Sequence, residues 1–324
     1  MTASPHIPVD VEFDTASRSD WDRLMAMAAR PAFEQSWAYG QGIATAPAMA
    51  ARRAVIRLGD EPFGGEPVAL VQGFTRSLGG VLQLTQILRG PVMLRDDLPA
   101  AAHGAVLRAT RNAFRRDWRE VLLWMPELAA APESQALMRA TGARRVMTGY
   151  SSSWIDLGAG EDELRHKLHG KWRNALVRAE DAGLRVRSAT GGRELDELLD
   201  RYAGLKRTRR FSGPSAALIR AAAEGATRRG DFLVLEAGPP RAPRAAILLV
   251  RHGNAATYVI GWADDEGRQR GAGNLLLWRG LVALKQQGVG WLDLGGFNTD
   301  KMAGIARFKL GLGGAPYTLA GTFL

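Results

Sequence analysis

The sequence predicts an α/β protein made of two similar domains in tandem, each a mixed, mainly antiparallel sheet flanked by helices. The first observation is length, since 324 residues are more than one hydrophobic core usually serves. The second is composition, because 46% hydrophobic and 23% charged residues are typical of a globular chain rather than a disordered one. The third is that one order of elements occurs twice along the chain.

The first half reads as helices, three strands, a helix and a strand. Apolar residues at helical spacing predict helices over 18–29, 35–44, about 97–117 and up to Gly142. Apolar runs between Gly-rich turns predict strands over 51–58, 67–77, 80–88 and 121–125.

The second half repeats that order. Helices are expected over 161–182, 192–209, 214–228 and 271–287. Strands are expected over 232–236, 244–251, 255–262 and 291–294. The match lies in the order of elements rather than in residue identity, and it indicates an ancient duplication.

Antiparallel strands, then a helix, then a strand that joins the same sheet require a right-handed crossover. GNAT acyltransferase domains have this order, so the chain resembles two tandem GNAT-like domains. The expected limits are 1–150 and 151–324, with only the polar run 150–153 between them. No Pro-rich or Gly/Ser-rich tether occurs there, so a short link is expected.

The formal net charge of +10 favours anionic partners such as phosphates, RNA or an acidic membrane surface. A GC-rich coding sequence also produces an Arg-rich chain, so charge alone does not select a partner. The chain has no cysteine, which excludes disulfides, thiolate nucleophiles and Cys-based metal sites. Neither a signal peptide nor a run of roughly 20 apolar residues is present, so we expect a cytoplasmic protein with at most peripheral contact with the inner membrane surface.

A glycine-rich loop, RQRGAG at 268–273, follows a predicted strand and opens a predicted helix. Backbone N–H groups and the helix dipole at such a place can face a phosphate. The loop resembles the pyrophosphate loop of GNAT acyltransferases, R-x-x-G-x-G, where glycines let the backbone approach acyl-coenzyme A. The resemblance implies cofactor binding at Arg268, Arg270, Gly271 and Gly273. An ordinary turn is the alternative, and the acidic residues at 264–266 weaken the phosphate interpretation.

The predicted helix over 161–182, which Gly170 can bend, is amphipathic and basic. Its apolar stripe consists of residues at helical spacing: Leu164, Leu168, Trp172, Leu176 and Ala179. A separate polar face carries residues spaced by four, three and four: Lys167, Lys171, Asn174 and Arg178. Residues 201–210 add five cations and no acid. These are either solvated helix faces or a cradle for a phosphate-bearing substrate or an RNA acceptor stem.

The C-terminal part carries the most specific motifs. Residues 292–297 read LDLGGF, and residues 304–314 read GIARFKLGLGG. They look like the Fem-type family that builds peptidoglycan interpeptide bridges, whose C-terminal domain has a D-x-G-G strand end and an R-F-K-x-G-F-G-G-like run. Residues 35–40, QSWAYG, are similar to the family's Q-S-x-x-W-G segment, and residues 171–183, KWRNALVRAEDAG, are similar to its basic helix.

This resemblance implies two fused GNAT-type domains that transfer an aminoacyl or acyl group to an amine of a larger acceptor. Bridge-forming members use aminoacyl-tRNA and a diphosphate-linked peptidoglycan precursor, whereas others in the wider group resemble acyl-thioester users. With the basic face, it points to substrate contacts at Tyr39, Lys167, Lys171, Arg173, Arg178 and Arg307. The chain departs from the bridge formers because Ile43 lies where a lysine is common, a long heptad arm is absent, and the loop 268–273 looks closer to a coenzyme A loop.

Direct transfer needs a donor carbonyl held near the amine, a base for the amine proton and positive groups for the oxyanion. Asp293, at a strand end, is the candidate carboxylate, and a turn-capping role is its alternative. Lys309, in the most family-like run, is expected to neutralise a phosphate or a developing negative charge, unless its stem lies along the surface. We expect no permanently bound cofactor, and either acyl-coenzyme A or aminoacyl-tRNA as the donor.

Other functions fit the sequence less well. The chain has no G-x-S-x-G or Walker-type motif, and His166 and His169 lack a third ligand, so no metal site is expected. The charge suggests a noncatalytic RNA-binding module, but RRM-like or OB-like interleaving of aromatic and basic residues is absent, and DNA is not an expected partner. A second enzymatic alternative is an acyl-thioester-dependent N-acyltransferase for a lipid or small amine.

Overall fold

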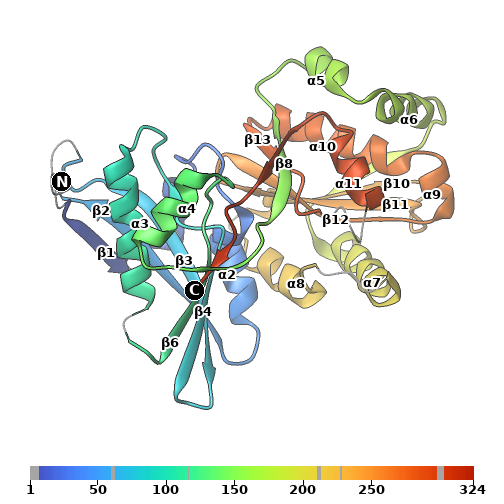
Figure 1. Cartoon of the computed structure of the whole chain (residues 1–324). Helices are drawn as coiled ribbons and strands as arrows, with labels where there is room; N and C mark the ends of the chain where they lie inside the picture. The colour runs from blue at the N-terminus through green and yellow to red at the C-terminus, as the bar shows by residue number, and fades with distance from the viewer. Residues whose placement is uncertain (1–6, 60–62, 116, 210–212, 227, 298–302) are drawn as a thin grey trace. The chain divides into compact units, whose positions relative to one another are not determined.

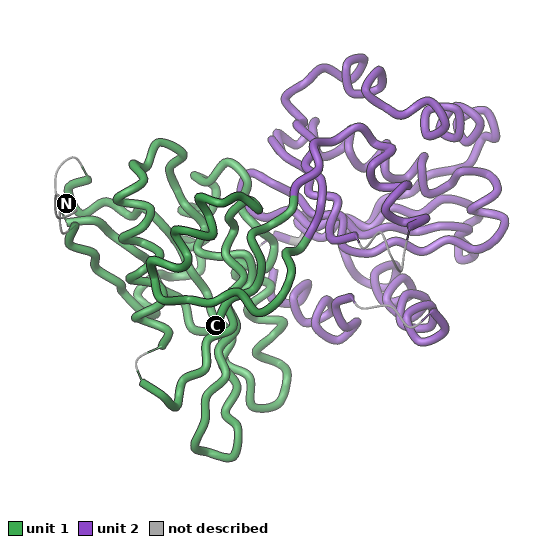
Figure 2. Tube along the Cα trace, viewed as in Figure 1, with its two compact units in different colours: residues 1–150, 318–324 green, residues 151–317 purple. Residues whose placement is uncertain are grey.

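The computed structural model describes residues 7–59, 63–115, 117–209, 213–226, 228–297 and 303–324. The chain forms two units, residues 1–150 with 318–324, called unit 1, and residues 151–317, called unit 2 (Figure 2). Each unit has a sheet and a hydrophobic core of its own.

Unit 1 contains a mixed sheet of order β1-β2-β3-β4-β6-β15-β7, with β5 beside β3 (Figure 1). The first four strands are antiparallel neighbours, and β6 lies parallel to β4. The strands are β1 (Val9–Phe13), β2 (Met49–Leu58), β3 (Pro67–Leu78), β4 (Leu82–Leu88), β5 (Val92–Met93), β6 (Glu120–Met125), β7 (Arg145–Met147) and β15 (Thr322–Phe323).

Helices cover both faces of this sheet. They are α1 (Arg18–Met25), α2 (Trp37–Ala44), α3 (Ala100–Phe114) and α4 (Pro132–Ala140). Ser36 caps α2 by accepting a hydrogen bond from the Tyr39 N–H. Trp21 of α1 packs with Leu70 of β3, whereas Phe114 of α3 packs with the next residue, Val71. Since successive side chains of a strand point to opposite faces, α1 and α3 lie on opposite sides of the sheet.

Unit 2 has a sheet of order β14-β8-β13-β12-β11-β10-β9. Its strands are β8 (Ser151–Asp156), β9 (Val186–Ala189), β10 (Phe232–Ala237), β11 (Ala245–His252), β12 (Ala255–Ala263), β13 (Trp291–Asp293) and β14 (Ala315–Thr318). Its helices are α5 (Glu161–Lys167), α6 (Gly170–Asp181), α7 (Gly192–Arg209), α8 (Ala216–Glu224), α9 (Asp265–Gln269), α10 (Ala272–Gln286) and α11 (Ala303–Leu310). Apolar residues of α6 and α10 form the core on one face, and Figure 1 shows α7 and α8 on the other.

The two sheets correspond strand by strand, but they exchange one position. Strands β1, β2, β3, β4 and β6 of unit 1 match β9, β10, β11, β12 and β13 of unit 2, and the edge strands β7 and β14 match as well. The strand between β13 and β14 is β8, which directly follows β7 in sequence. The strand between β6 and β7 is β15, which follows β14. Each sheet is therefore completed by the segment that leaves the other sheet.

The predicted fold class, two tandem GNAT-like α/β domains, is confirmed by these sheets and both parallel crossovers. Two local predictions are wrong. The helix expected over 161–182 is two helices, because Leu168 is extended and the His169 N–H bonds to the Gly311 carbonyl. In the polar run 150–153, residues 151–153 already belong to β8, so the short link lies at 148–150 instead.

Residues 318–324 were expected in the C-terminal domain, whereas the structure places them in unit 1 because β15 pairs with β6 and β7. That each unit is a separately folding domain stays a prediction.

Candidate active site

The site lies where two parallel strands of unit 2 part. β12 and β13 are paired from Ala255 opposite Trp291 to Thr257 opposite Asp293. There β13 ends, while β12 continues to Ala263. A β-bulge in the β11–β12 ladder, between Leu248 and Leu249, bends the ladder beside this point. We call the point beside Tyr258, where the β12–β13 ladder ends, the opening between the two strands.

Asp293 anchors the backbone at this opening. Its side chain is fully buried, and it accepts hydrogen bonds from the Ser152 hydroxyl, from the Gly295 N–H at 2.9 Å and from the Tyr317 hydroxyl at 3.1 Å. Gly295 has a φ of +68°, and a Cβ there would lie 2.5 Å from the Tyr258 carbonyl oxygen, so only glycine fits. The geometry fits a turn anchor, and the predicted catalytic role of Asp293 stays a prediction.

Lys309 of α11 is buried at this turn, with only 8% of its surface exposed. Its ammonium donates to the carbonyl oxygens of Gly295 at 3.1 Å and Gly296 at 2.8 Å, and it lies 5.3 Å from the centre of the Tyr258 ring. Burial lowers the pKa of Lys309 to about 8, and the nearby Asp293 carboxylate partly offsets that shift. Lys309 is therefore a buried cation held by two backbone carbonyls rather than a surface lysine.

The glycine-rich end of the motif holds α11 against α6. The Trp172 indole N–H donates to the Phe308 carbonyl at 3.0 Å, and the two rings lie 6.1 Å apart. A Cβ at Gly311 would come within 2.7 Å of the Trp172 ring, so the contact requires glycine. The 304–314 motif and the basic helix thus meet in space and fix the backbone of Lys309.

The loop 268–273 is packed and internally paired. Gly271 is the left-handed N-cap of α10, and a Cβ there would lie 2.7 Å from the Ala175 carbonyl oxygen of α6. Arg268 bonds to Asp265 and to the Ala263 carbonyl. Arg270 pairs with Glu266 at 3.3 Å and with the Ala182 carbonyl at 3.1 Å. Helix packing thus accounts for Gly271, and phosphate binding by this loop, Gly273 included, stays a prediction.

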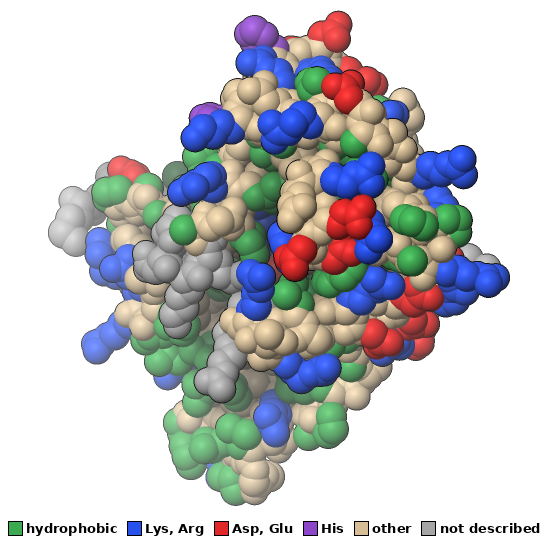
Figure 3. Space-filling view, turned by 90° about the vertical axis from the view of Figure 1, so that its right-hand side faces the viewer, with side chains coloured by type: hydrophobic (Ala, Val, Ile, Leu, Met, Phe, Trp, Pro, Cys, Tyr) green, Lys and Arg blue, Asp and Glu red, His purple; other side chains and the backbone are tan. Residues whose placement is uncertain are grey.

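The predicted basic residues fall on three helices of unit 2. Lys167, at the end of α5, pairs with Glu163 at 2.6 Å. Lys171 and Arg178 lie exposed on α6, Arg173 is half-buried there, and Arg307 is exposed on α11. Within the described residues, no ion pair engages these last four side chains. Figure 3 shows Lys and Arg side chains interspersed with Asp and Glu rather than one uniform basic surface.

The Q-S-x-x-W-G-like segment of unit 1 has a structural explanation. The Gln35 amide donates to the Gln72 and Leu88 carbonyls at 3.1 and 2.8 Å and accepts from the Gln72 N–H at 2.8 Å. Tyr39 packs its ring 5.2 Å from that of Phe33 and 5.6 Å from that of Phe74, and burial raises its pKa. The substrate contact predicted for Tyr39 stays a prediction, and these bonds explain the segment as architecture.

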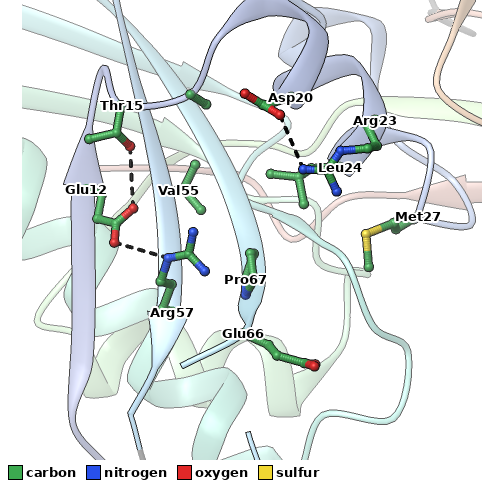
Figure 4. Close-up of a pocket in the computed structure, with 11 residues that line it drawn as sticks. Glu12, Thr15, Asp20, Arg23, Leu24, Met27, Val55, Arg57, Glu66 and Pro67 are labelled. Carbon is green, nitrogen blue, oxygen red and sulfur yellow. Dashed lines mark hydrogen bonds and ion pairs between the residues drawn. The ribbon is translucent and has the colours of Figure 1, made fainter. Parts of the chain in front are cut away.

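A pocket of about 550 Å³ lies elsewhere in unit 1, between β1, α1, β2 and β3 (Figure 4). Four of its charged residues pair within the wall, Glu12 with Arg57 at 3.1 Å and Asp20 with Arg23 at 3.3 Å, and Glu66 lies 4.0 Å from Arg95 outside it. Its lining includes none of the predicted site residues. Across the described residues, no group of three potential ligands is placed to hold a metal ion. No helix in the described part of the chain has the length and apolarity to cross a membrane.

Three residues of this site were missed from the sequence: Ser152, Tyr258 and Tyr317. Ser152 is separated from Asp293 by 141 positions, so no local pattern links the two residues. Tyr258 looked like one more apolar residue of a strand. The only available signal was the position of Tyr317 just after the GLGG run.

Residues 164–317 match the sequence family described as the acetyltransferase (GNAT) domain. Among curated protein sequences, none matches the chain. The crystal structure of FemX superposes with a TM-score of 0.79 at 13% identity, over 96% of each chain. A conserved protein of unknown function from Bacteroides thetaiotaomicron VPI-5482 gives 0.60 at 14% identity, over 96% of this chain and 99% of that one.

A tandem GNAT protein from the clavulanic acid biosynthesis pathway gives a TM-score of 0.51 at 18% identity, over 97% of this chain and 98% of that one. At such identities the likeness establishes the fold, here a Fem-type pair of GNAT-like domains. The family match assigns a GNAT domain to residues 164–317, and together with the fold it supports an acyltransferase. A GNAT domain suggests acyl-coenzyme A as donor.

Proposed function

We propose that the chain transfers an aminoacyl or acyl group to an amine of a larger, phosphate-bearing acceptor, directly and without a covalent enzyme intermediate. The observation that carries this proposal is the buried ammonium of Lys309 at the opening between β12 and β13. In this reaction the acceptor nitrogen attacks the donor carbonyl carbon, and a tetrahedral oxyanion forms. The oxyanion then collapses to the new amide, and the bond between the carbonyl carbon and the donor's ester oxygen or thioester sulfur breaks. The amine proton passes to that leaving group or to water.

Lys309 suits this reaction because a preorganised cation stabilises charge that develops in the transition state. Its two carbonyl partners fix the ammonium before substrate arrives, so little reorganisation is needed. With a pKa of about 8, the group is charged at neutral pH. Asp293 acts in this proposal as a positioning residue, since its bond to the Gly295 N–H shapes the turn whose carbonyls hold Lys309.

We favour aminoacyl-tRNA as the donor. The packing of Gly271 on α6 leaves little room for a pyrophosphate beside that residue, and Arg268 and Arg270 already have acidic partners. The aminoacyl-tRNA donor is also the one that the Fem-type resemblance implies. The family match to an acetyltransferase domain favours the alternative, an acyl-coenzyme A-dependent N-acyltransferase for a lipid or small amine.

We place the acceptor phosphate at the first turn of α6. This turn has no acidic residue and no side-chain cap, whereas the first turn of α5 has three acids: Glu161, Asp162 and Glu163. Lys171 and Arg173 lie within it, so their charges add to the positive end of the helix. The diphosphate-linked peptidoglycan precursor implied by the Fem-type resemblance, met in the cytoplasm, is an acceptor of this kind.

The donor is tested by mass spectrometry of products formed from aminoacyl-tRNA or acyl-coenzyme A, each with a peptidoglycan precursor and with small amines. We expect an acylated precursor from aminoacyl-tRNA only. Product from acyl-coenzyme A alone would replace our donor by the alternative. No product from any pair, with RNA binding retained, would contradict the enzymatic proposal itself.

The acceptor site is tested by the double variant Lys171→Gln/Arg173→Gln. We expect the acceptor KM to rise about tenfold with kcat within twofold, since removing uniform binding raises KM alone. Lys167→Gln is the matched control, because Lys167 pairs with Glu163 and its loss should change KM less than twofold. Equal effects of the control and the double variant on KM would contradict a phosphate site at the first turn of α6.

A further inference from the structure

The hairpin between β3 and β4 ends in exposed apolar side chains. Its turn is built by Gly79 and Gly80, both with positive φ, followed by Val81, which is 58% exposed. Trp118, in the turn before β6, is 73% exposed. With the exposed strand residues they form a set that we call the apolar tip: Leu78, Val81, Leu82, Trp118 and Val121.

The strand register places Leu78, Leu82 and Val121 of the apolar tip on one side of the sheet. Leu78 lies opposite Leu82 in the hairpin, and Leu84, two residues on from Leu82, lies beside Val121 of β6. Directly opposed residues, and residues two apart on one strand, share a face. The Gln83 N–H donates to the carbonyl of Arg119, which ties the turn of Trp118 to β4. The apolar tip is therefore drawn from the adjacent ends of three strands and the two turns beside them.

Arginines border this patch. Arg76 shares its face, being opposite Leu84, and Arg115 and Arg119 flank Trp118 in the chain. The Arg119 guanidinium lies 5.2 Å from the Trp118 ring centre. The neighbouring acid Asp117 accepts the Arg119 backbone N–H at 2.7 Å, so it is engaged in the turn. An apolar patch bordered by arginines is complementary to a partner surface that has an apolar interior beneath an anionic outer layer.

We infer that the apolar tip docks the protein on a bilayer of anionic lipid. The hairpin extends from the rest of unit 1 as a narrow end in Figure 1, and Figure 3 shows hydrophobic side chains at the bottom of the view. A projecting end, unlike a groove or flat face, can enter the boundary between headgroups and acyl chains. Tryptophan favours that boundary, and arginines beside it bind anionic headgroups. This docking is independent of the proposed transfer reaction and goes beyond it.

The test is flotation of the purified full chain with vesicles of phosphatidylcholine, alone or with phosphatidylglycerol. We expect binding to the mixed vesicles that weakens as salt is raised, and little binding to phosphatidylcholine alone. Trp118→Ser and Val81→Ser/Leu82→Ser should each lower the partition coefficient about tenfold, because they remove apolar area that enters the bilayer. Arg76→Gln/Arg119→Gln should lower it about threefold or more at low salt.

Met27→Ser is the matched control, since Met27 is an exposed apolar residue of unit 1 outside the tip, and it should leave binding unchanged. Equal melting temperatures exclude misfolding as the cause of any loss. Equal binding by the tip variants and wild type would overturn the inference. So would a dimer in light scattering that the tip variants dissociate without any lipid binding, because a second copy of the chain would then cover the tip.

Discussion

The parallel strand pairs of the two units begin alike and end differently. In unit 1, β4 and β6 are paired over the whole length of β6, from Gln83 opposite Glu120 to Leu88 opposite Met125. In unit 2, the equivalent strands β12 and β13 are paired only as far as Thr257 and Asp293. The first ladder is closed along its length, whereas the second opens beside Tyr258.

The closed end in unit 1 is held by a buried ion pair. Arg89 is fully buried and donates to both carboxylate oxygens of Glu127 at 2.8 Å, and its guanidinium lies 5.1 Å from the Tyr150 ring centre. The Trp124 indole N–H also donates to the Gly90 carbonyl at 2.6 Å. These bonds join the two strands at and just past their last pair. Unit 2 instead places there a buried cation whose partners are neutral carbonyls, Gly295 and Gly296.

This difference shows how one strand order serves two purposes. A cation neutralised by a bidentate carboxylate stabilises a junction but has little charge left for a substrate. Lys309 bonds to carbonyl dipoles, and the Asp293 carboxylate that attracts it accepts from three other donors, so more of the Lys309 charge stays available. We therefore expect variants in the unit 1 junction to affect stability, and variants in the unit 2 opening to affect transfer.

The largest expected effect is that of Lys309→Met, which keeps the apolar stem and removes the charge. We expect kcat/KM to fall about 30- to 1,000-fold, because one preorganised contact to a developing charge contributes roughly 2 to 4 kcal/mol. Steady-state kinetics with the donor identified above measure it. Lys285→Met is the control, since Lys285 also binds a carbonyl, that of Leu157, at 2.9 Å and lies outside the opening. If the kcat/KM of Lys309→Met stayed within twofold of wild type, Lys309 would not stabilise the transition state.

In unit 1, Glu127→Gln should lower the free energy of unfolding by roughly 2 to 3 kcal/mol, because it leaves the buried Arg89 charge without its bidentate partner. The folded variant should keep kcat/KM within twofold. Urea denaturation and kinetics on the same preparation separate the two effects. A large loss of activity at unchanged stability would break the contrast between the junctions.

The charge of Lys309 also predicts how stability depends on pH. Its pKa is lowered to about 8 in the folded protein, mainly by burial, from about 10.5 in the unfolded chain. Below pH 8 both states carry the proton, so the folded state bears the full cost of the buried charge. Between pH 8 and 10.5 the folded state loses the proton first, so stability rises with pH.

We therefore expect wild type to gain roughly 1 to 2 kcal/mol relative to Lys309→Met between pH 8 and 9.5, at up to about 1.4 kcal/mol per pH unit. Urea denaturation of the two proteins at each pH gives this difference and cancels the other titrating groups. A constant difference would mean that the pKa of Lys309 is not lowered.

The smallest expected effect concerns the start of α10, where unit 2 has Gly271 and the equivalent helix α3 of unit 1 has Pro99 as N-cap. Gly271→Ala should cost roughly 1 to 2 kcal/mol, because the residue has positive φ and its Cβ would press on the Ala175 carbonyl. Gly273→Ala, whose Cβ would only touch the Phe308 ring at 3.7 Å, should change stability by less than about 0.5 kcal/mol. If Gly273→Ala instead weakens acyl-coenzyme A binding, the loop serves a donor after all.

The fold was largely predictable because its signals are local. Apolar periodicity and Gly-rich turns marked the three-stranded meander and the crossover helix in each half, and those elements alone define the order of a GNAT-like domain. Contacts between distant segments were not predictable. The division of α5 from α6 depends on the Gly311 carbonyl, and the place of β15 depends on β6 and β7.

The site was predictable as a set of candidates but not as an arrangement. The run around Lys309 indicated the residue, yet its partners are carbonyls of Gly295 and Gly296, which a sequence pattern does not distinguish from other backbone groups. Asp293 was found by its strand-end position, whereas the hydroxyls that anchor it come from Ser152 and Tyr317. Gln35 looked like part of a functional motif. Its structural role depends on bonds to the Gln72 backbone, 37 positions away, which no local sequence pattern indicates.

The exchanged strands also set an order of events during synthesis. Multidomain chains usually complete their N-terminal domain first as they leave the ribosome. Here the sheet of unit 1 needs β15, which occupies Thr322–Phe323 near the end of the chain, whereas unit 2 needs nothing beyond β14. The half that is translated first is therefore the last to be finished. Until β15 has left the ribosome, the nascent sheet exposes β6 and β7 without the strand that joins them.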